Sequence, residues 1–434
     1  MTNSDEHDAY DPLTPVPQGQ RRLTARDAFS LWFSLGIGLL VLQAGAGLVP
    51  GLSFAGALIA IVIGSVAGAV LLALAGVIGC DTGLAGIAAL RPTLGVRGAA
   101  VAAVVNVIQL VGWGAFEIVA MRDAASQLSH QAFGFTLPVL WTLIFGAAAT
   151  GLAFLGPLSF VRRFLRHWGM WLLLAGAAWL TWSLLSRHDL MQIVSAPGKG
   201  GLGLGAAIDL VVVMPLSWLP LIADYSRFGV SSRAMFKGSA AGYALANIWF
   251  YALGAAFALI ARDGSGDLLV SALATTGGGL ALLLILIDET DNIFADIFSA
   301  ATSTGTLVAV PVRRLALGFG AVCTLIALFV ALSRFMDFLY MIGAVFTPLY
   351  GVLLIDHFVV RQRRVVAGDI SDLQGVYRFT AGVHISAFAA WAVGIAAYYY
   401  FLTYLPQAGA TLPAFFLAAV SYWGLSQSFA KPVA

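Results

Sequence analysis

The apolar residues of this 434-residue chain fall into twelve long runs, and this pattern limits the possible folds more than any other feature. A membrane-spanning helix needs about 20 consecutive, mostly apolar residues. Only 10% of the residues are charged, whereas soluble proteins have roughly 25%. We therefore predict an all-α polytopic membrane protein with twelve transmembrane helices. The runs cover roughly residues 28–49, 54–78, 98–126, 137–156, 168–187, 204–226, 238–261, 268–302, 314–332, 336–359, 380–402 and 411–429.

The basic residues alternate between the two sides of this predicted bundle. If the N-terminus is cytoplasmic, eighteen of the 23 Lys and Arg residues lie in cytoplasmic segments. The five others are Arg122, Arg187, Lys199, Arg262 and Arg334. Cytoplasmic loops of membrane proteins carry an excess of Lys and Arg. We therefore expect a multi-pass protein of the cell (inner) membrane with both termini in the cytoplasm.

Two of the predicted spans are interrupted by their own residues. The first contains Gly36 and Gly38 with two further glycines, and the sixth contains Pro215 and Pro220. Interrupted helices at corresponding places in two halves of a chain are typical of inverted-repeat transporters, whose site lies near the membrane midplane. Gly and Pro are also common in transmembrane helices generally. The pattern thus favours a transporter over a purely structural explanation.

The chain divides into a polar beginning and a long apolar remainder. We expect residues 1–27, which are polar and contain three prolines, to form a disordered cytoplasmic tail. Residues 28–434 then form the transmembrane transporter domain. Within it we expect one repeat at about 28–187, a second at about 204–360, and two accessory helices at about 380–430.

The third span carries polar side chains on one face. At 100° per residue, Asn106, Trp113 and Glu117 fall within about 40° of one another. Gly112 and Gly114 are expected to leave room beside the Trp113 ring, which would form a slot for a flat polar molecule. The alternative is a structural Glu117 that bonds a neighbouring helix, with Trp113 as packing.

The eighth span is unusually acidic. A carboxylate at the centre of a membrane helix costs about 2.5–3.5 kcal/mol. A sector of about 100° holds Asp288, Glu289, Asn292, Asp296 and Ser299. Asp291 lies outside this sector and Thr290 faces the other way. Three explanations stay open: a cation and substrate site at depth, acids that extend past the membrane interface, and a structural hydrogen-bond network.

Several short motifs resemble one known family. They are "SLWFSLGIG" at 30–38, "GWGAFE" at 112–117, "ADYSRF" at 223–228, "DETDN" at 288–292 and "DIFSAA" at 296–301. Together they are similar to motifs of the nucleobase:cation symporter-1 family, with the closest likeness to its branch of hydroxymethylpyrimidine transporters (CytX). The resemblance runs across nearly all twelve spans. It implies a LeuT-type fold, with two inverted five-helix repeats plus two helices, and sodium- or proton-coupled import of nucleobases, hydantoins or related heterocycles.

The resemblance also implies roles for individual residues. Trp113 takes the place of the family's stacking tryptophan, and Glu117 that of a substrate-bonding glutamine. Gly36, Ile37 and Gly38 lie where carbonyls of the first helix would line the cation site. The family's second stacking aromatic falls on a proline, Pro215, so the other half of a stacking pair is in doubt. The nearest ring to that position is Trp218.

The motif of the eighth helix aligns with the family in two ways. One alignment puts Thr290 at the family's cation-binding hydroxyl. The other puts Asp291 and Asn292 there, with Asp296 at the substrate-binding asparagine. Asp288 is a further candidate for the cation, or for a proton. Both alignments stay open.

Glutamate at position 117 suits one class of substrate. A 4-aminopyrimidine presents an NH2 donor beside a ring-nitrogen acceptor, and a carboxyl group can meet both, depending on its protonation. Gln43, Ser217 and Asn106 are candidates for the remaining polar edges. We expect cation-coupled (Na+ or H+) import of a small pyrimidine, such as hydroxymethylpyrimidine or a related thiamine precursor, by alternating access. The alternative is a cytosine, purine or allantoin-type permease of the same fold.

Other functions fit the sequence less well. "GSGD" at 264–267 matches a pattern of intramembrane aspartyl proteases, but it falls in a predicted external loop, so no enzyme is expected. A passive channel would not need broken helices. Cys80 and Cys323 lie in no metal-ligand spacing, so no disulfide or metal site is predicted beyond a possible transported Na+. The expected partners are a small heterocyclic substrate and the lipid bilayer, with no cofactor, nucleic acid or obligatory protein partner.

Overall fold

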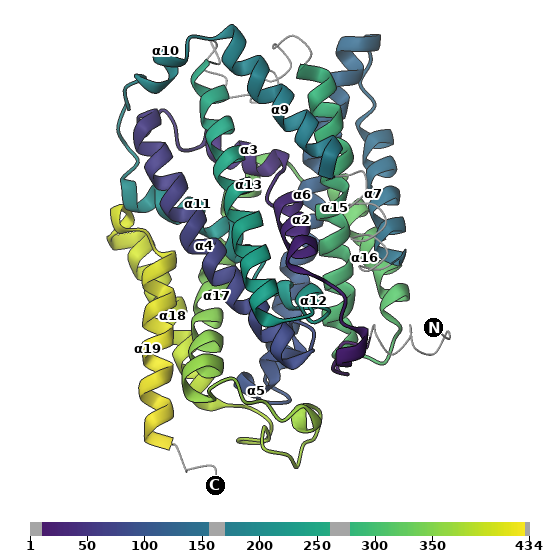
Figure 1. The fold of residues 1–434 in the computed structure, drawn as a ribbon, viewed down its shortest axis with the longest axis vertical. Helices are drawn as coiled ribbons and strands as arrows, with labels where there is room; N and C mark the ends of the chain where they lie inside the picture. The colour runs from purple at the N-terminus through teal and green to yellow at the C-terminus, as the bar shows by residue number, and fades with distance from the viewer. Residues whose placement is uncertain (1–10, 156–169, 261–277, 430–434) are drawn as a thin grey trace.

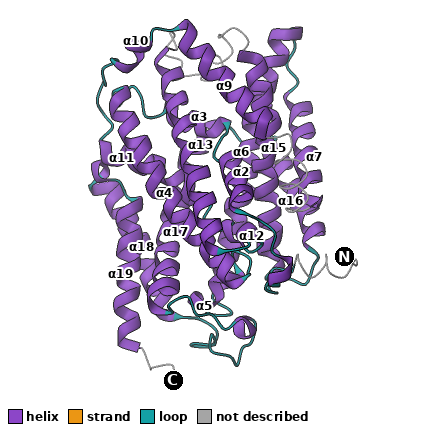
Figure 2. Ribbon diagram, in the orientation of Figure 1, coloured by secondary structure: helices purple, strands orange, loops and turns teal. Residues whose placement is uncertain are grey.

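The computed structural model describes residues 11–155, 170–260 and 278–429. In these segments long helices are joined by loops and short turns (Figure 2). The described chain begins and ends at the same end of the bundle (Figure 1), as an even number of crossings requires. The "GSGD" stretch at 264–267 lies outside the described residues.

Each of the twelve predicted spans overlaps a helix or a pair of helices. By length and composition, six helices of the described segments can cross a membrane, and a bent pair adds a seventh. In chain order the helices of the twelve spans are α2 (Ala25–Leu35) with α3 (Leu39–Ala46), α4 (Phe54–Thr82), α6 (Ala99–Phe133), α7 (Pro138–Leu155), α9 (Met170–Arg187), α11 (Leu204–Ser217) with α12 (Ile222–Ser226), α13 (Ser232–Ile260), α15 (Gly278–Gly305), α16 (Val312–Ala327), α17 (Phe335–Ile355), α18 (Ile385–Tyr404) and α19 (Thr411–Phe429).

The first and sixth spans are broken, as predicted. Helices α2 and α3 meet at an angle of 58°, and the extended backbone at Gly38 separates them. In the sixth span, α11 ends at Ser217 and α12 begins at Ile222. Pro215 lies in the last turn of α11, where its ring and missing N–H weaken the helical hydrogen bonds.

The helices pack in two groups, with two further helices outside them. Helices α2, α3, α4, α11 and α13 form one group, and α6, α7, α15 and α16 form the other. Each half of the chain thus gives its first two spans to one group and its next two to the other, as an inverted repeat requires. Helices α18 and α19 pack on each other and against α17, at the left of Figure 1.

Close backbone contact holds the broken first span against α13. A Cβ at Gly45 would lie 2.2 Å from the Tyr251 carbonyl oxygen, and one at Gly254 would lie 2.1 Å from that of Leu42. Only glycine permits this approach, which is how transmembrane helices gain packing energy without a hydrophobic driving force. The position of α3, and hence of the break, depends on these two glycines.

The ordered part of the chain begins earlier than predicted. Thr24 caps α2 by a capping box with Asp27, and the side chains of Val16 and Leu23 are buried. The expected tail through residue 27 is therefore too long, because its second half packs against the bundle. Residues 1–10 lie outside the described segments.

Candidate functional site

Trp113 and Glu117 lie one turn apart on α6, and both side chains are buried. The Trp113 ring packs edge-on against Phe335 and Phe338 of α17, with ring centroids 5.6 and 5.5 Å away. A Cβ at Gly112 would lie 2.4 Å from the Phe338 ring. The expected open space beside Gly112 is therefore wrong. Gly112 instead lets Phe338 approach α6.

Asp296 of α15 faces Glu117 from the neighbouring helix. The two carboxyl groups lie within hydrogen-bond reach of each other, and their residues are only 3% and 1% exposed for Glu117 and Asp296. A Cβ at Gly114 would lie 3.8 Å from Asp296 Cβ and 3.0 Å from Cys323 Sγ, so the helices approach closely here. Acidic side chains within membrane helices almost always face the interior of the bundle and mark functional sites.

Several buried polar atoms around this pair have no hydrogen-bond partner among the described residues. They are Trp113 Nε1, Asp296 Oδ2 and Asn292 Oδ1. Each unmade hydrogen bond in a buried place costs about 1–3 kcal/mol. A ligand with matching donors and acceptors would recover this free energy, so the cluster marks the candidate binding site.

Asn106 lies on the same face of α6 as Glu117 but about three turns away along the helix. Its Nδ2 donates to Ser303 Oγ at 2.7 Å, and its Oδ1 accepts from Gln109 Nε2 at 3.0 Å. Eleven residues separate Asn106 from Glu117, which is about 16 Å along a helix. One pyrimidine ring cannot contact both side chains. The structure thus places Asn106 in a bracing hydrogen-bond chain, apart from the acid pair.

The break in the sixth span brings Ser217 and Trp218 into the core. Gln109 Nε2 also donates to the Ser217 carbonyl at 3.3 Å, while the Ser217 hydroxyl donates to Met214 O at 2.6 Å. The Trp218 ring packs edge-on against Trp32 at 6.2 Å. Its described ring contact is thus with α2.

Two further predicted positions lie on neighbouring helices. Gln43 is half-buried on α3, which packs against α6. Pro215, at the family's second aromatic position, packs against α4, where a Cβ at Gly68 would lie 2.3 Å from Pro215 Cγ. Pro215 therefore contributes to helix packing, and Gln43 is the better placed of the two for contact with a ligand.

The break in the first span contacts two residues of α15. Glu289 was not among the predicted ligands, whereas Asn292 was placed at the cation site by one of the two alignments. Glu289 Oε2 accepts from the Leu39 N–H at 3.1 Å, and its carboxylate lies against Gly38. Asn292 Nδ2 donates to the Ile37 carbonyl at 3.4 Å. This carbonyl was expected to line the cation site. In the structure it faces the Asn292 amide.

The other predicted cation residues are less well defined. Thr290 is half-buried, and the side chains of Asp288 and Asp291 lie outside what the structure describes. Glu289 shares its helical sector with Asn292 and Asp296, and that spacing is the sequence signal by which it could have been found. The angle alone did not show which member of the sector would contact the break.

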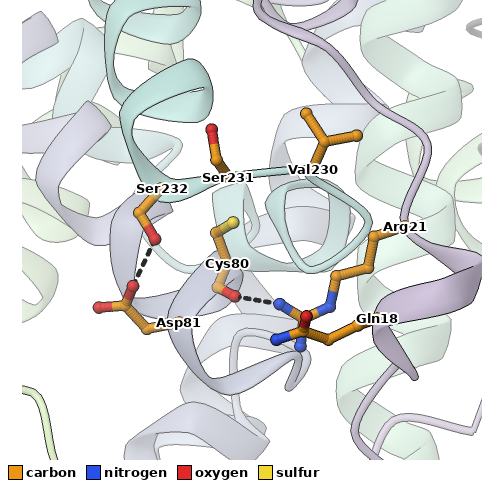
Figure 3. A pocket seen from close by; sticks show the side chains of 7 residues that line it. All are labelled: Gln18, Arg21, Cys80, Asp81, Val230, Ser231 and Ser232. Carbon is orange, nitrogen blue, oxygen red and sulfur yellow. Dashed lines mark hydrogen bonds between the residues drawn. The ribbon is translucent and has the colours of Figure 1, made fainter.

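A cavity of about 290 Å³ lies away from this site, at the end of α4 (Figure 3). It is lined by Gln18, Arg21, Cys80, Asp81, Val230, Ser231 and Ser232. Its charged groups contact other protein groups: Arg21 donates to the Cys80 carbonyl at 2.6 Å, and Asp81 accepts from Ser232 and, at 2.6 and 2.8 Å, from Arg363. The hydrogen bonds to Asp81 raise the pKa of Arg363. The residues around the cavity thus connect α4 by hydrogen bonds to α13 and to the segment after α17.

Comparison of the sequence with known proteins gives several matches that span most of the chain. A profile of the family described as "permease for cytosine/purines, uracil, thiamine, allantoin" matches residues 15–424. A hydantoin permease of Microbacterium maritypicum is 23% identical over 410 residues, which cover 88% of this chain and 82% of that protein.

Comparison of the structure identifies the fold. The chain is similar to Mhp1, a nucleobase-cation-symport-1 family transporter solved in a closed conformation with bromovinylhydantoin bound. The TM-score is 0.82 at 20% identity, over 96% of both chains. It is also similar to a Na+-coupled sialic acid symporter, with a TM-score of 0.67 at 14% identity over 99% of this chain and 94% of that one. The predicted fold, two inverted five-helix repeats plus two helices, is confirmed.

Proposed function

The chain belongs to the family of permeases for cytosine/purines, uracil, thiamine and allantoin, and we propose that it imports a small pyrimidine with a cation by alternating access. It is a transporter and not an enzyme. Hydroxymethylpyrimidine, or a related thiamine precursor, is the substrate we propose. The proposed location is the cell membrane, with both termini in the cytoplasm.

The acid pair beside Trp113 is the observation that carries this proposal. A 4-aminopyrimidine presents an NH2 donor next to a ring-nitrogen acceptor. Glu117 and Asp296 lie within hydrogen-bond reach of each other, and a pair with one proton, turned toward the substrate, would offer one carboxylate acceptor and one carboxyl donor. The neighbouring Trp113 offers a ring face and an indole N–H. The placement of Asp296 supports the alignment in which it replaces the family's substrate-binding asparagine.

A cytosine, purine or allantoin-type substrate is the alternative. Cytosine carries the same amino and ring-nitrogen edge as hydroxymethylpyrimidine, so the acid pair alone does not separate the two. Uracil and hydantoins present carbonyl oxygens at the corresponding edge, and a carboxylate would repel these. Because the chain is similar to a hydantoin permease, substrates with carbonyl edges are included in the uptake experiment below.

The proposed coupling ion is Na+ or H+. One positive charge moving inward gains about 2.3 kcal/mol per 100 mV, which corresponds to roughly 50-fold accumulation of substrate. Two places could hold the ion. One is the break in the first span, with Ile37, Glu289 and Asn292 and the candidates at 288, 290 and 291. The other is the acid pair.

Uptake into proteoliposomes tests the proposed substrate. The competitors are hydroxymethylpyrimidine, thiamine, cytosine, uracil, hypoxanthine and hydantoin. We expect Glu117→Gln to reduce aminopyrimidine uptake about 10- to 150-fold, because a hydrogen bond to a charged group contributes about 1.5–3 kcal/mol. Asp209→Asn is the matched control, since Asp209 is a buried acid of α11 that accepts from the Thr411 N–H at 2.5 Å, far along the chain from the pair. Unchanged transport by Glu117→Gln would remove Glu117 from the site.

A further inference from the structure

Four basic side chains are exposed at the end of the bundle where the described chain begins. Arg22 precedes α2 and Arg26 lies in its first turn, whereas Arg233 and Lys237 lie in the first two turns of α13. Within the described part of the chain, none of these four side chains forms a hydrogen bond or an ion pair. We call the four residues the basic patch.

The backbone brings the two parts of the basic patch together. Val230 N donates to Leu23 O at 2.9 Å, so the segments before α2 and α13 run side by side. A Cβ at Gly238 would lie 2.4 Å from Ala25 O, so the two helices touch one turn further on (Figure 1). Each of these contact residues lies within three residues of a cation of the patch. The four charges are therefore concentrated in one place.

An apolar surface continues from the basic patch along both helices. On α13 the exposed positions recur every four residues, from Arg233 and Lys237 to Leu245, which is 55% exposed. Residues four apart share one face of a helix. On α2, the exposed Arg26 is followed three residues later by the half-buried Phe29. A surface that passes from cations to apolar side chains is complementary to a molecule with an anionic head and hydrocarbon chains.

Two acids of the described chain lie next to the basic patch, and both already have partners. Asp27 is 2% exposed and forms a capping box with Thr24. Asp81 accepts from Ser232 at the start of α13, and also from Arg363 at 2.6 and 2.8 Å. These acids therefore leave the charge of the basic patch unneutralised.

We propose that the basic patch binds the headgroup of an anionic phospholipid, whose acyl chains lie along Phe29 and Leu245. Arginine donates paired hydrogen bonds to phosphate oxygens, and long basic side chains reach the headgroups from the surface of a helix. On the proposed topology this end faces the cytoplasm, where the membrane leaflet carries anionic lipids. Because α2 is half of the broken first span, the lipid stabilises the position of that span against α13.

Thermal unfolding of the full-length chain in a non-ionic detergent tests the proposal without any measurement of transport. Phosphatidylglycerol should raise the thermal midpoint and saturate, whereas phosphatidylcholine with the same acyl chains should leave it near the lipid-free value. This comparison needs only the wild-type chain, so it does not depend on the folding of a variant.

A double variant and a matched control test the residues. In Arg26→Gln/Lys237→Gln the half-saturating concentration of phosphatidylglycerol should rise about 25-fold, because each basic residue near an anionic surface contributes about fivefold. Arg313→Gln/Arg314→Gln removes the same charge at the start of α16, in the other helix group. Its half-saturating concentration should stay within twofold of the wild-type value.

Four results would overturn the proposal, and none of them depends on which heterocycle is imported. Three are an equal effect of the two lipids, an equal weakening in both double variants, and the same rise in midpoint with glycerol phosphate, which has no acyl chains. The fourth concerns the acidic beginning of the chain, with Asp5, Glu6 and Asp8. If phosphatidylglycerol stabilises only a chain that lacks residues 2–10, these acids occupy the basic patch in place of a lipid.

Discussion

Gly38→Ala should disconnect the break in the first span from α15. The added Cβ would lie 2.8 and 2.9 Å from the two carboxylate oxygens of Glu289 and 3.2 Å from its Cδ. Carbon and oxygen atoms do not approach so closely, and Glu289 is 1% exposed. Its side chain must therefore rotate away. The backbone at Gly38 is extended, with φ 173°, so the substitution adds no backbone strain of its own.

The cost of this rotation follows from the contact that it breaks. Glu289 Oε2 accepts from the Leu39 N–H, the first orphan donor of α3, at 3.1 Å. A hydrogen bond to a charged group contributes about 1.5–3 kcal/mol. We expect the population of the intact break to fall by a factor of about 10 to 150, with a similar loss in initial uptake rate and a lower thermal midpoint.

The assay compares initial uptake per reconstituted protein, with thermal unfolding in detergent as a second readout. Gly151→Ala in α7 is the matched control, because a Cβ at Gly151 would meet nothing within 4 Å. Uptake by Gly38→Ala within twofold of wild type would refute the reasoning. A double-mutant cycle adds a sharper check, since Gly38→Ala should cost little once Glu289→Ala has removed the carboxylate.

Three further substitutions distinguish residues that bind substrate from residues that stabilise the fold. Asn106→Ala should lower the free energy of unfolding by about 1–3 kcal/mol, because Gln109 and Ser303 each lose a hydrogen bond to Asn106, while the substrate concentration at half-maximal uptake stays within threefold. Trp113→Phe should raise that concentration about 2- to 12-fold with little change in thermal midpoint, because the indole N–H has no described protein partner to lose. Arg91→Lys should lower the thermal midpoint. The buried Arg91 guanidinium donates hydrogen bonds to Ile370 O, Ser371 Oγ and Thr306 O, and an ammonium group cannot match that geometry. An unchanged midpoint would contradict this.

The fold was predictable because hydropathy and backbone breakers act locally. Each run of about 20 apolar residues must form a helix to satisfy its backbone in lipid. Gly36 to Gly38 and Pro215 interrupt two of these helices for reasons that lie in the residues themselves. The predicted beginning of the ordered chain was wrong, because the burial of Val16 and Leu23 depends on distant segments.

The sequence predicted on which face of each helix the site residues lie, but not how far apart they lie along the helix axis. A helical projection places Asn106 with Glu117, but it ignores the rise along the helix that keeps them about 16 Å apart. The same projection groups Glu289, Asn292 and Asp296 without showing which neighbour each one contacts. Phe338, which fills the space beside Gly112, comes from a helix more than 200 residues further along the chain.

The acidic residues of α15 contact two different parts of the site. Glu289 contacts the break in the first span, and Asp296 contacts Glu117, two turns further along the same helix. A helix is stiff over two turns, so a shift of Glu289 moves Asp296 with it. The geometry of the break and substrate binding beside Asp296 are therefore linked, and each must alter the other's equilibrium by the same free energy. Gly38→Ala, although it touches neither carboxyl group of the pair, should for this reason raise the substrate concentration at half-maximal uptake as well as lower the rate.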